Sequence, residues 1–362
     1  MAKVALAMSG GVDSSVALHL LREKGYDVVG VHMKTFPDIY FDFARYTKKK
    51  VCCSPEDTFD AMKVAKEAGV EFHVLRFGEI FETHVVDYFV DTYAAGCTPN
   101  PCAFCNRYLK FGAMMDEAMK KFDCEFFATG HYAQVEYVEK FGKYMLKMGR
   151  DRDKDQSYFL SLIEPERLSR ILFPLGQYTK EEIRTRARNL RLHVSEKKES
   201  QEICFVPYDD IKTYLMKKLG IRKGPIKDLE GKVLGEHEGF YFYTVGQRKG
   251  LKVSAGKRLY VHHVVPAENT VVVAERDALM ASNIVARNIN MFLKIEELEE
   301  LEDLRCKVRN KSQLAAVKEI SILDDQLKVK LKKPVFAVTP GQIVTVYWRE
   351  YVIMAGIIEG WE

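Results

Sequence analysis

The sequence predicts an α/β protein in three parts: an N-terminal domain built on a parallel sheet, a small central domain and a C-terminal β-barrel. An apolar strand, a glycine turn and a helix open the chain. Strand and helix signals then alternate through the first half, which is typical of a parallel sheet with helices on both faces. From about Gly224 onward, strand patterns and turns dominate. We expect the domains to span residues 1–206, 207–275 and 276–362.

Length and composition are those of a globular protein. The 362 residues allow two or three domains, with 47% hydrophobic and 29% charged residues. The net charge of +4 permits a local patch for nucleic acid without requiring one. No apolar run approaches the ~18 residues of a membrane span, and no signal peptide is evident. We therefore expect a cytoplasmic protein without a membrane partner, whose eight cysteines are reduced.

The first candidate site is the stretch A-M-S-G-G-V-D-S-S at residues 7–15, which follows the apolar run 4–6. Gly10 and Gly11 allow close approach of the backbone to a phosphate, and the following helix N-terminus attracts anions. No G-x-x-x-x-G-K-[ST] motif is present, so the loop carries no lysine for a γ-phosphate. Asp13 would repel phosphate unless Mg²⁺ lies between them. The alternative is an ordinary turn with two glycines.

Further strands are predicted at Asp27–Met33, Glu71–Phe77 and Glu125–Thr129. The glycine loop, Met33 and Gly130 each follow a predicted strand. Because ligands bind at the carboxyl ends of parallel strands, we expect these residues to converge. Helices are expected at about 55–69, 79–95, 107–121 and 154–193, with a loop over 97–106.

A hairpin is predicted over 134–148, around the turn F-G-K. Later turns are expected at Glu230-Gly231, Asn269 and Asp324-Asp325, with closing strands at 344–348 and 352–358. This spacing of short strands predicts the C-terminal barrel.

Three cysteines form the second candidate site: Cys102 and Cys105 in P-N-P-C-A-F-C-N, and Cys204 in Q-E-I-C-F. C-x-x-C spacing brings two thiols close enough to share a metal, a cluster or a disulfide. The predicted loop is polar and bounded by proline, a poor place for core packing, although incidental burial remains the alternative.

These stretches together resemble the tRNA-specific 2-thiouridylases of the MnmA family. The matching motifs are S-G-G-V-D-S-S (9–15), H-M-K (32–34), C-C-S-P-E-D (52–57), T-P-N-P-C-A-F-C-N (98–106), A-T-G-H-Y (128–132), K-D-Q-S-Y-F-L (154–160), Q-E-I-C-F (201–205), Y-T-V-G-Q-R-K-G-L (243–251) and V-T-P-G-Q (338–342). The resemblance implies a pyrophosphate-loop domain of the adenine nucleotide α-hydrolase type. It also implies a sulfurtransferase that uses ATP and Mg²⁺ to replace O2 of the wobble uridine, position 34 of tRNA, by sulfur. The uracil carbonyl is adenylated with release of pyrophosphate, and sulfur from a cysteine persulfide or an iron–sulfur-bound sulfide then displaces AMP.

The resemblance also implies the roles of individual residues. The catalytic residues would be Asp13, Cys105 as the partner thiol and Cys204 as the persulfide carrier. ATP would contact Ala7, Met8, Ser9, Gly10, Gly11, Val12, Asp13, Ser14, Ser15, Met33 and Gly130. The target base would contact Asn100, Pro101 and Cys102, and the tRNA would contact His131, Lys154, Asp155, Gln156, Lys311 and Gln342.

One position departs from the best-known members, which carry aspartate where this chain has Cys102. With Cys105 and Cys204, it offers three thiolates, which suit a [4Fe–4S] cluster with one open iron. The alternatives are a persulfide relay with a spare thiol, or a zinc site, for which no fourth ligand is evident.

The expected partners are the anticodon arm of a tRNA and a sulfur donor, either a cysteine desulfurase, a sulfur carrier or free sulfide. Phosphate contacts are expected from basic side chains. The candidates are Lys48–Lys50, Arg184, Arg186, Arg188, Arg191, Lys197-Lys198 and Arg248-Lys249. Two other functions fit parts of the chain: another adenylating pyrophosphate-loop ligase, which would not need the cysteines, and a non-catalytic RNA-binding protein, which would not need Asp13.

Overall fold

The computed structural model describes residues 1–35, 55–198, 203–206, 210–253 and 256–362. Contacts divide the chain into two compact units. The first comprises Met1–Val85, Cys102–Asp209 and Glu350–Val352, and the second comprises Val86–Pro101, Asp210–Arg349 and Ile353–Glu362. None of the described helices is long and apolar enough to cross a membrane.

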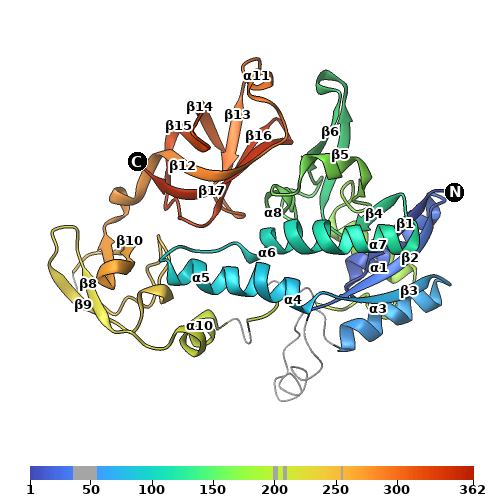
Figure 1. The fold of residues 1–362 in the computed structure, drawn as a ribbon, viewed down its shortest axis with the longest axis horizontal. Helices are drawn as coiled ribbons and strands as arrows, with labels where there is room; N and C mark the ends of the chain where they lie inside the picture. The colour runs from blue at the N-terminus through green and yellow to red at the C-terminus, as the bar shows by residue number, and fades with distance from the viewer. Residues whose placement is uncertain (36–54, 199–202, 207–209, 254–255) are drawn as a thin grey trace. The chain divides into compact units, whose positions relative to one another are not determined.

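The first unit contains the predicted parallel sheet, which is therefore confirmed. Its five strands lie in the order β3-β2-β1-β4-β7, and all four neighbouring pairs are parallel. The strands are β1 (Lys3–Ala7), β2 (Asp27–Lys34), β3 (Glu71–Arg76), β4 (Phe126–Thr129) and β7 (Ile171–Leu172). Ala7 pairs with Val31 of β2 and with Thr129 of β4. The segments that follow β1, β2 and β4 therefore leave the sheet at one edge (Figure 1).

The helices of this unit are α1 (Val12–Glu23), α3 (Pro55–Glu67), α4 (Gly78–Phe81), α6 (Pro101–Phe104), α7 (Met115–Phe122), α8 (Ser157–Leu160) and α9 (Lys180–Asn189), with wider turns η1 (Glu82–Asp87) and η2 (Cys105–Met114). Two element ends belong to the second unit by their contacts: Val86 and Asp87, the last residues of η1, and Pro101, the first residue of α6. The hairpin β5 (Ala133–Val138) and β6 (Lys143–Met148) follows β4, as predicted.

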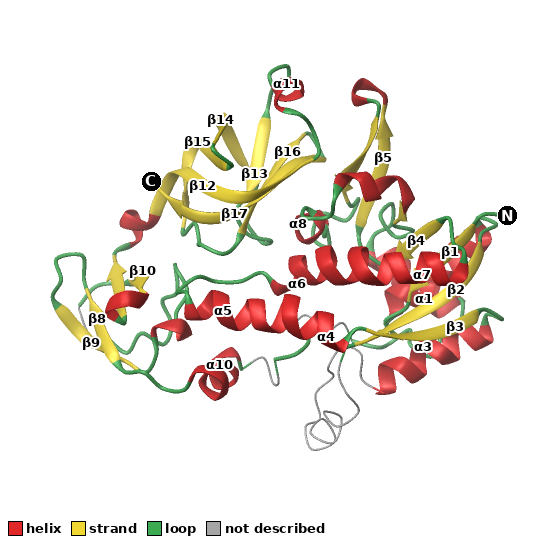
Figure 2. Ribbon diagram, viewed as in Figure 1, coloured by secondary structure: helices red, strands yellow, loops and turns green. Residues whose placement is uncertain are grey.

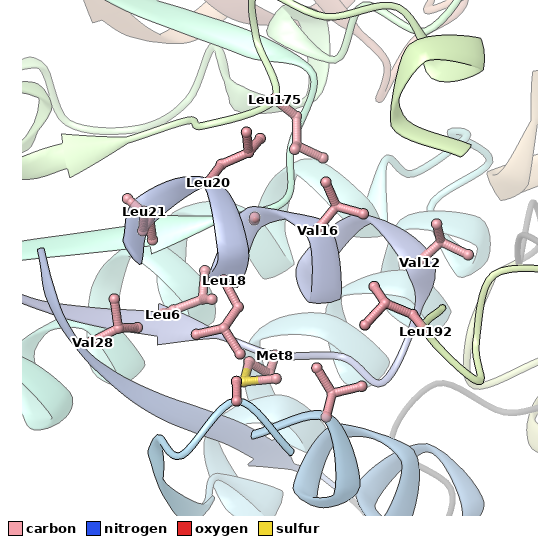
Figure 3. Close-up of a cluster of buried hydrophobic side chains, with 14 of the residues drawn as sticks. Leu6, Met8, Val12, Val16, Leu18, Leu20, Leu21, Val28, Leu175 and Leu192 are labelled. Atoms are coloured by element: carbon pink, nitrogen blue, oxygen red, sulfur yellow. The ribbon is translucent and has the colours of Figure 1, made fainter. Parts of the chain in front are cut away.

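One core holds α1 in place. Val16, Leu20 and Leu21 of α1 pack with Leu6 of β1 and with Leu175, and all of them are at least 98% buried. Figure 3 shows this cluster around α1. Ile183 and Ala187 of α9 belong to the same cluster, so α9 is fixed against α1 although it lies far away in sequence.

Two predicted elements of this unit were wrong. The chain is already helical from Pro101, where we expected a loop to residue 106. Proline suits the first helical position because its missing N–H has no partner there in any case. The segment 154–193, expected to be helical, also contains the short strand β7, which pairs with Phe127 and Ala128 of β4. Two residues are too few to produce a periodic signal.

The second unit is rich in β-strands (Figure 2). After α5 (Tyr88–Ala94) and α10 (Ile211–Leu219), a four-stranded sheet has the order β10-β11-β8-β9. Its strands are β8 (Gly224–Lys227), β9 (Val233–His237), β10 (Tyr260–Val265) and β11 (Thr270–Ala274). Gly231 and Asn269 have positive φ at its turns, as the sequence predicted.

The C-terminal barrel is confirmed. Six strands run in the order β12-β15-β14-β13-β16-β17, and a further β12–β17 pairing closes the ring. They are β12 (Met280–Met291), β13 (Leu304–Lys307), β14 (Ala315–Leu323), β15 (Gln326–Phe336), β16 (Ile343–Trp348) and β17 (Tyr351–Trp361). Closure leaves no open edge, and fully buried side chains such as Ile284, Val329 and Val346 fill the core.

Candidate active site

The glycine loop joins β1 to α1 and is held by its own hydroxyl groups. Ser15 Oγ donates to Gly11 O at 2.8 Å, Ser14 Oγ donates to the same oxygen at 3.2 Å, and Ser9 N–H donates to Ser14 Oγ at 3.2 Å. Gly10 has φ +72°, and a Cβ there would collide with the backbone carbonyl of Asp57. Glycine is therefore required at residue 10 both by its conformation and by the close approach of α3.

The loop opens into a cavity of about 330 Å³. It brings together most of the predicted nucleotide-binding residues, namely Ala7, Met8, Ser9, Gly11, Val12, Asp13, Ser14, Met33 and Gly130, with three predicted tRNA-binding residues, His131, Lys154 and Gln156. Gly10 and Ser15 are buried in the loop itself. Glycine suits residue 130 because a Cβ there would lie only 3.0 Å from Ser14 N, closer than an ordinary van der Waals contact. The strand ends therefore converge as the parallel topology requires.

Asp13 is paired with a cation that the sequence did not reveal. Lys180 Nζ lies 2.8 Å from each carboxylate oxygen of Asp13, and Tyr132 Oη donates to Oδ1 at 2.8 Å. Lys180 begins α9, where Thr179 and Glu182 form a capping box. The T-K-E-E spacing could have marked this helix start, but nothing local indicates that its first residue reaches Asp13.

A second lysine, Lys197, is hydrogen-bonded to both the glycine loop and α3. Lys197 Nζ donates to Gly10 O at 2.7 Å, to Asp57 Oδ1 at 2.7 Å and to Asp60 Oδ2 at 2.5 Å. Burial by itself lowers the pKa of Lys197, but the two carboxylates outweigh it, so the pKa is raised. We expected Lys197 to contact tRNA phosphate. Its ammonium group instead ties α3 to the glycine loop.

Two residues near the loop have shifted pKa values. Burial by itself raises the pKa of Asp60. Hydrogen bonds and charges from Lys197 and His193 together outweigh burial, so the pKa lies below its usual range. Burial, with a smaller contribution from Lys110, lowers the pKa of His131 well below its usual range, so the ring is neutral at pH 7. His131 Nδ1 lies 2.7 Å from Thr129 Oγ1.

The segment Lys154–Gln156 is organised by its middle residue. Asp155 is 6% exposed, and its carboxylate accepts hydrogen bonds from Gly149 N–H, Ser157 N–H and Ser157 Oγ. Gln156 Oε1 accepts from Tyr132 N–H at 2.9 Å. Asp155 thus shapes the turn that places Lys154 and Gln156 on the cavity wall.

The cysteines differ in exposure. Cys102 is exposed on α6, Cys105 at the start of η2 is buried, and Cys204 is half-buried in a turn. Phe205, beside Cys204, packs edge-on against Phe81 at 5.8 Å between ring centroids. Residues Lys48–Ser54, with Cys52 and Cys53, and residues Gln201 and Glu202 lie outside the described part of the chain.

Within the described ranges, no three His, Cys, Asp or Glu side chains are grouped so that they could hold a metal ion. The cluster on Cys102, Cys105 and Cys204 therefore stays a prediction.

The remaining predicted residues lie in the second unit. Gln342 Nε2 donates to Thr98 O at 3.2 Å and to Pro99 O at 2.8 Å, and so holds the segment that leads to the C-x-x-C motif. Asn100 is buried, and its N–H donates to Tyr88 Oη at 3.3 Å. Lys311 is exposed between β13 and β14.

Three family models match consecutive parts of the chain. A tRNA methyl transferase HUP domain matches residues 2–208, a tRNA methyl transferase PRC-barrel domain matches 212–275, and an aminomethyltransferase beta-barrel domain matches 281–358.

Curated relatives match over nearly full length. The chain is 44% identical to the tRNA-specific 2-thiouridylase MnmA of Thermotoga sp. (strain RQ2), covering 99% of both chains. It is 41% identical to that of Petrotoga mobilis, covering 98% of this chain and 97% of the relative. Among solved structures, a 4-thiouridine synthetase–RNA complex with bound ATP aligns with a TM-score of 0.35 and 17% identity over 60% of this chain and 50% of that chain, a likeness too weak to argue from.

Proposed function

The chain belongs to the family of tRNA-specific 2-thiouridylases, and we propose that it thiolates the wobble uridine of tRNA in two steps within one catalytic unit. ATP first activates O2 of the uracil as an adenylate, and sulfur then replaces that oxygen. The observation that carries this proposal is the cavity at the glycine loop, which combines an anion cradle with Asp13 and several lysines. We place the reaction in the cytoplasm, where a soluble tRNA substrate is found.

The first step converts the uracil O2, which is a poor leaving group, into a good one. The uracil O2 attacks the α-phosphorus of ATP, a new O–P bond forms, and the bond between the α-phosphorus and the bridging oxygen breaks. The electron pair leaves with pyrophosphate. Backbone N–H groups at the start of α1 and lysines on the cavity wall stabilise the negative charge on the phosphates. His131 is neutral, so it offers hydrogen bonding rather than charge at this wall.

Mg²⁺ fits this cavity as a partner of ATP. Mg²⁺ is usually held by one or two carboxylates together with substrate phosphates, and the carboxylates of Asp13 and Asp57 both lie on the wall. Both carboxylates are paired with a lysine, Asp57 with Lys197 and Asp13 with Lys180. Asp13 lies in the first turn of α1, directly after the glycine loop, so we assign the ion to Asp13. When bound, the ion would neutralise phosphate charge.

The second step uses the cysteines. The terminal sulfur of a Cys204 persulfide attacks C2 of the adenylated base, and the C2–O bond breaks as AMP leaves. The Cys105 thiolate then attacks the inner sulfur of Cys204, which releases 2-thiouridine and forms a Cys105–Cys204 disulfide. A cellular thiol reductant must reopen that disulfide, and a sulfur donor must supply the next persulfide.

The iron–sulfur alternative rests on Cys102, which adds a third thiol to those of Cys105 and Cys204 as a possible cluster ligand. The described positions of the three cysteines do not gather them into a metal-binding group, so we assign no step to a cluster. Anaerobic purification followed by iron and sulfide analysis decides between the two routes. Full activity in metal-free protein would reject the cluster.

Two of the matching family models are described as tRNA methyl transferase domains, and that description refers to a different reaction, methyl transfer. Methyl transfer does not require ATP to be split beside a pyrophosphate loop, and it does not need paired thiols. The loop and the cysteines therefore favour thiolation, in agreement with the 2-thiouridylase relatives.

The test is nucleoside mass spectrometry of unmodified tRNA incubated anaerobically with the full chain, ATP, Mg²⁺, a thiol reductant and a cysteine desulfurase with cysteine, which delivers sulfur at the persulfide level. We expect 2-thiouridine at position 34, and pyrophosphate release that depends on tRNA. Unchanged uridine with every sulfur source would overturn the proposal. A parallel incubation with sulfide alone separates the two routes. Sulfide cannot form the Cys204 persulfide without an oxidant, so 2-thiouridine formed from sulfide alone would favour the iron–sulfur alternative.

A further inference from the structure

Lys180 brings an ammonium group to the glycine loop, whose own sequence contains no lysine. Its side chain is only 10% exposed, and it reaches from the first residue of α9 to the carboxylate of Asp13. The two residues are 167 positions apart, and both line the cavity at the glycine loop. The ammonium group also lies 5.5 Å from the ring centroid of Tyr132, whose hydroxyl donates to the same carboxylate.

The pair places opposite charges inside an anion cradle. A carboxylate alone there would repel the phosphates of ATP, whereas an ammonium group attracts them and suits phosphate as a compact point charge. An ATP molecule in this cavity presents several negative oxygens at close range. Lys180 Nζ carries three donor hydrogens, so it can contact a phosphate oxygen while Asp13 turns to a bound cation.

Lys197, which lines the same cavity, has a structural role and serves as a comparison for Lys180. Its ammonium group contacts two carboxylates and the Gly10 carbonyl, all of them on the elements that build the loop. Lys180 instead contacts Asp13, the residue expected to bind the metal–nucleotide complex. The two lysines therefore differ in what their ammonium groups hold.

We propose that Lys180 is a phosphate-binding residue of the adenylation step, which rests on the proposed function. When ATP occupies the cavity, Lys180 contacts an oxygen of the β- or γ-phosphate. As the bond from the α-phosphorus to the bridging oxygen breaks, Lys180 stabilises the negative charge that the pyrophosphate takes away, and no proton is transferred. The fold thus supplies from α9 the lysine that the loop lacks.

The first experiment measures binding of ATP and of AMP to the purified full chain by calorimetry, with Mg²⁺ and without tRNA. AMP lacks the β- and γ-phosphates, so Lys180→Met should weaken ATP about ten- to a hundredfold and leave AMP unchanged. Arg167→Met is the matched control, since it removes a cation and an ion pair with Asp116, and Arg167 is not among the residues that line the cavity. It should change neither affinity. Equal losses for ATP and AMP, or no loss for ATP, would overturn the proposal.

A second pair of variants covers the case in which Lys180→Met fails to fold because Asp13 loses its counter-charge. Asp13→Asn and Asp13→Asn/Lys180→Met are compared for ATP binding in EDTA, where no cation takes part. The single variant should bind ATP more tightly than the double variant, about ten- to a hundredfold. Equal binding would refute the role of Lys180. Neither assay needs tRNA or sulfur, so failure of thiolation and failure of this inference remain distinguishable.

Discussion

The activating half of the site and its sulfur half are built differently, although both lie in the first unit. Around the glycine loop, hydroxyls and two lysines fix the backbone and the carboxylates by hydrogen bonds of 2.5–3.2 Å. The three cysteines instead differ from one another in exposure. Cys102 is exposed, Cys105 is buried, and Cys204 is half-buried in a short turn.

The difference suggests a division of labour. Phosphate binding benefits from a rigid cradle, because donors that are already aimed cost no reorganisation during the reaction. In the proposed reaction, the thiols receive, transfer and release sulfur one after another, so a single fixed arrangement is not required. If this is correct, the two halves can be damaged separately.

The largest effect is expected from the thiols. Cys105→Ser or Cys204→Ser should reduce 2-thiouridine formation at least about a thousandfold, because a serine hydroxyl cannot carry or resolve a persulfide. Release of pyrophosphate in the presence of tRNA should continue. Cys124→Ser is the control, since Cys124 is buried, its thiol donates to Phe122 O, and it is not among the residues that line the cavity. Loss of both activities in either catalytic variant would contradict the separation of the two halves.

A smaller effect is expected at the glycine loop. Gly10→Ala should lower the free energy of unfolding by about 2 kcal/mol or more, through the positive φ and the collision with Asp57 O, and should weaken ATP binding. Gly25→Ala is a matched control. Its φ is +82°, but nothing lies within 4 Å of the added Cβ, so only about 1 kcal/mol of backbone strain is expected. Urea denaturation with and without ATP measures both terms. Equal losses in the two variants would show that the contact with α3 is unimportant.

The smallest effect concerns the Lys197–Asp60 pair. Because the pKa of Asp60 is lowered in the folded chain, its contribution to stability is present above the ordinary aspartate pKa of about 3.9 and is lost as the pH falls through the lowered value. Asp60→Asn should therefore cost about 1 kcal/mol at pH 7 and progressively less below about pH 4. Urea unfolding of both proteins between pH 3 and pH 7 tests this. A difference that does not change with pH would show that the ion pair contributes nothing.

Much of the fold was predictable because its signals are local. The apolar strand, the glycine turn and the helix at residues 3–23 follow one another within a few turns of chain. The convergence of Met33 and Gly130 on the loop followed from parallel topology alone. The helix start at Pro101 was missed because the Pro, Asn and Cys composition of 97–106 favoured a loop, and β7 because two residues carry no period.

The sequence by itself therefore determined the kind of chemistry: an anion cradle with Asp13, a set of thiols, and the strand ends at which the nucleotide residues meet. Only the tertiary structure decided which charges complete the cradle. Lys180 reaches Asp13 because Ile183 and Ala187 pack α9 into the same core as α1. Lys197 reaches Gly10 across 187 residues, and Leu192 and Val194, which precede it, belong to that core as well. Turn and helix signals act over a few residues, whereas the partner of a buried charge depends on which distant helix the hydrophobic core places beside it.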